Sequence, residues 1–111
     1  MTPPQKPGRS RQDHETPPAF AWVNPPFARL GPWVEKCAWE SHEQGLRIAA
    51  LLPADVGTEW FATHVAGKAH ELFLRPRPIF VGETAPYPKD LMLCLYDGPR
   101  IGYTTWDWRA T

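Results

Sequence analysis

The run Asn24-Pro25-Pro26-Phe27 constrains this chain more than any other stretch, because it directly follows the apolar segment 19–23. Neither proline has a backbone N–H to donate, so a strand over residues 19–24 must end here. The asparagine precedes a proline and is pushed toward an extended conformation. The pattern predicts a stiff turn that carries an amide and an aromatic ring at the carboxyl end of a strand. Ligands bind there in open α/β sheets, so a pocket for a planar amine such as a nucleobase is one interpretation, and a plain strand-ending turn is the other.

Size and charge limit the classes of protein to consider. The chain has 111 residues, enough for one domain with a modest core. Twelve basic and twelve acidic side chains give a net charge of zero, so the basic excess of a protein that binds nucleic acid alone is missing. A DNA partner therefore requires a local basic patch or help from another subunit. No apolar run approaches about 18 residues and no signal-peptide pattern is present, which predicts a cytoplasmic protein with no membrane partner.

The cysteines and histidines predict no metal site. Cys37 and Cys94 are far apart in the sequence, and the four histidines are scattered without a zinc-binding spacing. Two lone cysteines in apolar stretches are expected to be buried thiols.

Composition predicts a proline-rich disordered leader over residues 1–18. Apolar periodicity predicts one α/β domain over residues 19–111. Strands are expected at 19–24, 46–52, 71–74 and 91–96, and a further short strand at 79–81 is left open. Helices are expected from Gly31-Pro32 to Gly45 and over 58–68. The first helix carries an apolar stripe that comprises Trp33, Val34, Cys37, Ala38 and Ser41. Alternating strands and helices predict right-handed crossovers and an open, mostly parallel sheet, with 46–52 buried on both faces.

Four pieces of the chain, in order, resemble the phage-type (Dam-like) DNA N6-adenine methyltransferases. WVNPPF at residues 22–27 looks like the amino-methylation motif of that family, and GPWVEK at 31–36 is similar to the helix that follows it. LLPA at 51–54, trailed by Trp60-Phe61, resembles the next strand and helix, and RPIF at 77–80 loosely resembles a later arginine-led segment. The likeness covers roughly residues 20–96.

This resemblance implies the carboxyl-terminal half of an enzyme that transfers a methyl group from S-adenosylmethionine to the N6 amine of adenine in DNA. It also implies a partial Rossmann-like methyltransferase sheet. The catalytic residues would be Asn24, Pro25, Pro26 and Phe27. An exocyclic amine is a poor nucleophile because its lone pair is delocalised into the purine. The Asn24 amide oxygen and the Pro25 carbonyl would each accept one N–H, and Phe27 would stack on the extruded base.

Several charged residues have two interpretations. Arg29, Arg75 and Arg77 would contact DNA phosphates by the same resemblance, and solvated surface charges are the alternative. Asp55 follows the 46–52 strand and is expected to cap the next helix, with contact to the substrate as the alternative.

The cofactor-binding segment of the family, a glycine-rich turn or an acidic strand end, is not found in this sequence. The best candidate, Phe80-Val81-Gly82, lacks a second glycine. Without the strand that such a segment provides, residues 19–23 form an apolar sheet edge, which is a pairing hazard. The leader, the aromatic segment 103–108, a second copy of the chain or a partner protein is expected to cover this edge.

Two further functions remain open at the level of sequence. A non-catalytic, methyltransferase-derived binding module fits the missing cofactor motif and the zero net charge. A structural α/β domain without a ligand is the third alternative.

Overall fold

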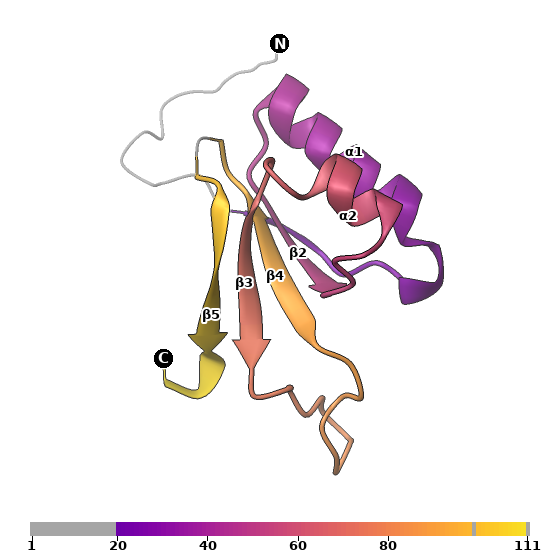
Figure 1. Cartoon of the computed structure of the whole chain (residues 1–111), viewed down its shortest axis with the longest axis vertical. Coiled ribbons are helices and arrows are strands. Elements are labelled where there is room, and N and C mark those ends of the chain that lie inside the picture. Colours follow the sequence, from indigo (N-terminus) through magenta and orange to yellow (C-terminus); the bar gives the residue numbers. More distant parts are fainter. Residues whose placement is uncertain (1–19, 99, 111) are drawn as a thin grey trace.

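A five-stranded mixed sheet and two helices make up residues 20–98 and 100–110, which the computed structural model describes (Figure 1). The strands are β1 (Ala21–Val23), β2 (Ile48–Pro53), β3 (His70–Arg75), β4 (Leu91–Tyr96) and β5 (Gly102–Asp107). The helices are α1 (Leu30–Gln44) and α2 (Glu59–His64), with 3-10 turns η2 (Phe27–Arg29) and η3 (Trp108–Ala110). The predicted leader, residues 1–18, lies outside the described residues.

The strand order is β1-β2-β4-β3-β5. The predicted α/β class is confirmed, but the sheet is mixed, so a mostly parallel, Rossmann-like sheet is not confirmed. β1 pairs parallel with β2 and β3 pairs parallel with β5, but β4 runs antiparallel to both of its neighbours. Parallel neighbours need a crossover, usually a helix. The connection between β3 and β4 contains four prolines over residues 76–90 and forms no helix, so the chain returns antiparallel.

Local signals placed the ends of α1 correctly. Gly45 adopts the left-handed conformation (φ 72°) and its N–H donates to the Ser41 carbonyl at 3.1 Å, as a C-terminal glycine should. The second helix was predicted over 58–68 but ends at His64. The chain turns there because Gly67 is also left-handed (φ 76°), a conformation that interrupts a helix.

The structure decides two segments near the carboxyl end that the sequence left open. Residues 79–81 form no strand and lie in an exposed loop. Residues 102–107, left unassigned in the sequence, form β5, which is rich in the β-branched and aromatic residues that favour strands. β5 pairs with β3, at the opposite edge of the sheet from β1. The segment 103–108 therefore does not cover β1, which pairs only with β2 among the described strands.

The core lies between the helices and one face of the sheet. From α1 it takes Leu30, Val34, Cys37 and Ala38, from β2 Ile48, Ala50 and Leu52, and from β4 Met92, Cys94 and Tyr96. All six residues of β2 are buried, as predicted for this strand, but Leu46, which the prediction included, is 47% exposed and lies outside it. Trp33 was assigned to the core stripe but is 45% exposed, because it lies on the outer side of α1. Cys37 and Cys94 are buried free thiols, as predicted, and burial raises the pKa of both.

One buried hydrogen bond joins the sheet to the end of α2. The Tyr96 hydroxyl donates to the His64 carbonyl at 2.7 Å, and the tyrosine is 1% exposed. The carbonyls in the last turn of a helix have no partner within the helix, so this bond satisfies one of them.

Replacing Tyr96 with Phe should lower the free energy of unfolding by about 1–2 kcal/mol, because the His64 carbonyl loses its donor in a buried place. Denaturant unfolding followed by circular dichroism measures this change. Tyr103→Phe is the matched control and should be nearly neutral, since that side chain is 76% exposed. Equal effects of the two variants would contradict the assignment.

Glu71 is a buried carboxyl on β3, with 5% exposure. Desolvation by burial raises its pKa, because the ionised form is disfavoured away from water. A group with a raised folded-state pKa favours folding when protonated and loses that contribution as the pH rises.

Glu71→Gln should therefore raise the thermal midpoint at pH 7 and change it little at pH 4. Below the unfolded-state pKa of about 4.3 the glutamate is protonated in both states. As the pH rises through that value and the higher folded value, the unfolded chain ionises first and the parent protein loses stability that the variant keeps. Thermal scans across this pH range test the prediction, and a midpoint difference that does not depend on pH would contradict it.

Candidate functional site

The turn after β1 presents its amide to solvent. Pro25 is buried and anchors the turn, whereas Asn24 and Pro26 on either side are exposed. Pro26 is extended (φ −66°, ψ 133°) and leads into η2, where the Arg29 N–H donates to the Pro26 carbonyl at 3.4 Å. The Asn24 carboxamide makes no hydrogen bond with any residue of the described part of the chain. Its oxygen and nitrogen are therefore available to a ligand.

An aromatic row fixes the ring that follows the prolines. Phe27 packs against the core and also meets Tyr87 edge-on, with ring centroids 6.1 Å apart and planes at 89°. Tyr87 in turn meets Phe80 at 5.5 Å and 73°. The Tyr87 N–H donates to the Pro78 carbonyl at 2.9 Å. The loop 76–90 is thus packed onto the turn that carries Asn24.

The same loop encloses a hollow of about 540 Å³. It is lined by Phe80, Val81, Glu83, Ala85, Pro86, Tyr87 and Pro88. Sequence reasoning missed Tyr87 and this hollow. Two aromatic residues within a proline-rich stretch were the available signal, but nothing in the sequence said that they would meet Phe27.

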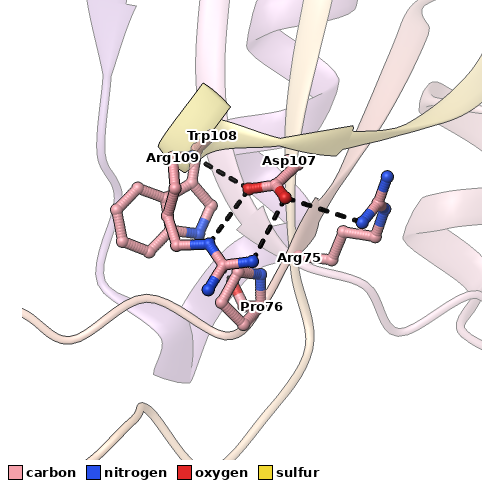
Figure 2. Close-up of polar contacts among 5 residues, drawn as sticks. All are labelled: Arg75, Pro76, Asp107, Trp108 and Arg109. Atoms are coloured by element: carbon pink, nitrogen blue, oxygen red, sulfur yellow. Dashed lines mark hydrogen bonds and ion pairs between the residues drawn. The ribbon is translucent and has the colours of Figure 1, made fainter. Parts of the chain in front are cut away.

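Arg75 ends β3 and lies within a cluster of charges at the end of β5 (Figure 2). Asp107 accepts hydrogen bonds from the Arg109 backbone N–H at 3.0 Å and from its side chain at 3.1 and 3.2 Å. Arg75 completes the cluster at 3.7 Å from Asp107. The hydrogen bond from Arg109 is the main cause of the lowered pKa of Asp107. The Trp108 indole N–H donates to the Pro76 carbonyl at 2.6 Å, so the ends of β3 and β5 are tied together.

The predicted phosphate contacts do not form one cluster with Asn24. β3 lies three strand positions from β1, which places Arg75 on the order of 14 Å across the sheet from the turn. Arg77 is paired with Asp90 at 2.9 Å and is about half exposed. Arg29 is exposed on η2, close to Asn24 in the sequence.

Asp55 does not cap α2 with its side chain. Its carboxylate pairs with Lys89 at 2.9 Å, and the Thr58 hydroxyl accepts the capping hydrogen bond from the Phe61 N–H at 3.3 Å. The capping prediction for Asp55 is therefore wrong, because a threonine at the cap position is equally suited to the role.

The described residues form no evident binding site for S-adenosylmethionine. Such a site combines a glycine-rich turn that opens a helix with a carboxylate for the ribose. The turn between β2 and α2 has Gly57 alone, and the nearby Asp55 carboxylate is engaged by Lys89. No described group of three or more metal-ligating side chains lies together, and no described helix is long and apolar enough to span a membrane.

The fold and the turn together define a small α/β protein with an amide–proline–proline–aromatic turn, in which the amide is exposed, after an edge strand. Comparison with models of protein families matches residues 11–90 to DNA N-6-adenine-methyltransferase (Dam). The match includes the turn at 24–27, and the chain belongs to this family. No curated protein and no solved structure shows a significant match.

Tyr87→Ala should loosen the turn, because it removes the ring contact that joins Phe27 to the loop 76–90, together with the Phe80–Tyr87 contact inside that loop. An aromatic pair such as Phe27–Tyr87 contributes about 0.5–1.5 kcal/mol, so the Arg29 amide should exchange its hydrogen roughly two- to tenfold faster. Hydrogen exchange followed by NMR measures this rate. Tyr87→Phe keeps the rings and should exchange as the parent does. An unchanged rate in Tyr87→Ala would show that the loop does not support the turn.

Proposed function

We propose that this protein is the catalytic part of a phage-type DNA adenine-N6 methyltransferase, acting in the cytoplasm of a prokaryotic or phage-infected cell. The observation that carries the proposal is the exposed Asn24 carboxamide, unpartnered among the described residues, on a turn inside the region that matches the family. An amide with no structural partner has no evident role in stability and is suited to a ligand.

The turn suits the chemistry of an adenine amine. The Asn24 side-chain oxygen accepts one hydrogen of the amine and the Pro25 carbonyl accepts the other, which favours the tetrahedral nitrogen needed for attack. The burial of Pro25 keeps that backbone rigid, so little reorganisation accompanies the reaction. Phe27 offers a ring to an extruded base, and its packing against the core and Tyr87 holds that ring in position.

Three exposed arginines, Arg29, Arg75 and Arg77, suit the DNA backbone. Arg29 lies two residues beyond Phe27 and is exposed, so it would contact a phosphate close to the extruded base. Arg75 and Arg77 would reach flanking phosphates, in exchange for their pairs with Asp107 and Asp90. These carboxylates partly neutralise the edge, in keeping with the net charge of zero.

The methyl donor of the family, S-adenosylmethionine, would be held mainly by residues other than those described. The outer edge of β1 pairs with no described strand, and this is where a further strand would add. A cofactor-binding segment, a second copy of the chain or a partner protein would each supply it. The alternative function, a non-catalytic base-binding module, is favoured by the lack of a cofactor site among the described residues.

Asn24→Ala should reduce N6-methyladenine formation by at least about 10²-fold, the usual loss when one group that stabilises a transition state is removed. Its thermal stability should stay close to that of the parent, since Asn24 is exposed and unpartnered among the described residues. Unmethylated DNA is incubated with S-adenosylmethionine and the full chain, and methyladenine is measured by mass spectrometry. Gln44→Ala, at an exposed amide at the end of α1, is the matched control and should retain activity.

Calorimetry with S-adenosylmethionine, with and without adenine-containing DNA, separates the alternatives. Binding of the cofactor supports the enzyme. A folded parent protein that binds DNA but neither binds the cofactor nor methylates DNA would favour the base-binding module. A large loss of stability in Asn24→Ala would instead show that the asparagine is a structural turn residue.

A further inference from the structure

A second hollow of about 420 Å³ lies beside α2, over β3 and β5. We call it the β3–β5 hollow; the lining residues used below are Val56, Phe61, Glu71, Phe73, Ile101 and Tyr103. It has no part in the proposed methyl transfer, because none of these residues belongs to the turn at 24–27 or to the loop 76–90. Its size falls within the range of small-molecule pockets, about 300–1,000 Å³.

Glu71 is the one acidic group among the described lining residues. The exposed fraction of this residue is 5%, and its side chain makes no hydrogen bond or ion pair with any described residue. Lys68, three residues earlier, is not paired with it. The Glu71 carboxylate oxygens are not among the fully buried side-chain atoms that lack a partner. Since Glu71 lines the hollow, a group that occupies this space can donate a hydrogen bond to its carboxylate.

Aromatic rings line the hollow close to this carboxyl. The rings of Phe73 and Tyr103 have centroids 6.0 Å apart with planes at 58°, and Tyr103 is the residue opposite Glu71 in the β3–β5 pairing. Aromatic faces attract organic cations, and such interactions strengthen when water is excluded. Apolar walls with rings and one carboxyl are the features of a site for an amine on an apolar body.

Other ligand classes fit less well. A divalent cation requires several oxygen ligands, and the described residues form no group of three or more metal-ligating side chains. An anion would be repelled by the carboxylate. A neutral apolar molecule would fill the space and leave Glu71 without a donor.

We propose that the β3–β5 hollow binds a small organic cation, a protonated amine carried on an aryl or alkyl body, with Glu71 as its counter-ion. The ammonium donates to the Glu71 carboxylate, and the apolar body packs between Phe61, Phe73 and Ile101. Burial raises the pKa of Glu71 in the empty site, and a bound ammonium would lower it again because an opposite charge favours the ionised form.

The test uses 2-phenylethylamine as the probe and the full chain at pH 7. Titration followed by NMR should shift the amides of Gly67 and Gly102, two residues that also line the hollow. The affinity of Glu71→Gln should be at least tenfold weaker. That variant is isosteric and is expected to fold, since it removes a buried charge. Glu83→Gln, which lines the other hollow, should bind as the parent does.

Two controls make the outcome decisive. 2-Phenylethanol has the same body without the charge and should bind the parent and Glu71→Gln equally and weakly. Val56→Lys places a competing ammonium at the exposed rim and should abolish amine binding in a folded protein. Three outcomes would each overturn the proposal. The parent and Glu71→Gln could bind the amine with equal affinity, the parent could bind the alcohol and the amine with equal affinity, or the shifts could be confined to other residues. The test does not involve methyl transfer, so its result is independent of the proposed function.

Discussion

The antiparallel insertion of β4 between β2 and β3 determines where the candidate site is built. β1, β2 and β3 run in one direction and end at the same edge of the sheet. Because β4 runs the opposite way, the connection from β3 to β4 stays at that edge and does not cross to the other. The loop 76–90 is thereby brought against the turn that carries Asn24, and Tyr87 meets Phe27. A parallel β4 would have carried the chain away from this edge and left Phe27 without that support.

Some residues of the turn are held in place by packing, and a neighbouring residue remains exposed to solvent. Pro25 and Phe27 are held by packing, whereas Asn24 between β1 and Pro25 extends into solvent without a described partner. A reacting group benefits from such a supporting shell, because its backbone does not need to reorganise. The charged residues follow a different pattern, since Arg75, Arg77 and Lys89 each pair with an aspartate. The edge of the sheet therefore carries charges of both signs and is not uniformly basic. A DNA phosphate that bound here would replace an aspartate as the partner of a basic side chain.

Local signals predicted most of the elements, and non-local pairing accounts for the errors. β4 has the predicted bounds, and Gly45 ends α1 as expected. The end of α2 and the absence of a strand at 79–81 depend on backbone turns that short apolar runs do not reveal. β5 was missed because its tyrosine and threonines are exposed and because it pairs with β3, a strand distant in sequence. At the site, the turn at 24–27 was predicted, but Tyr87, the salt bridge of Asp55 and the hollow around Glu71 all require residues distant in sequence to meet.

The amino-acid sequence by itself determined that a strand stops at Asn24, since two prolines cannot continue a ladder, and that an amide and a ring follow it. It also determined family membership, since a family model matches residues 11–90 of the sequence. Tertiary structure alone decided that the sheet is mixed, that β1 and β5 occupy opposite edges, and that Glu71 is a buried residue that lines a hollow. The physical reason is that strand direction, burial and pairing depend on which distant segments pack together, and a residue's own neighbours in the chain do not specify them.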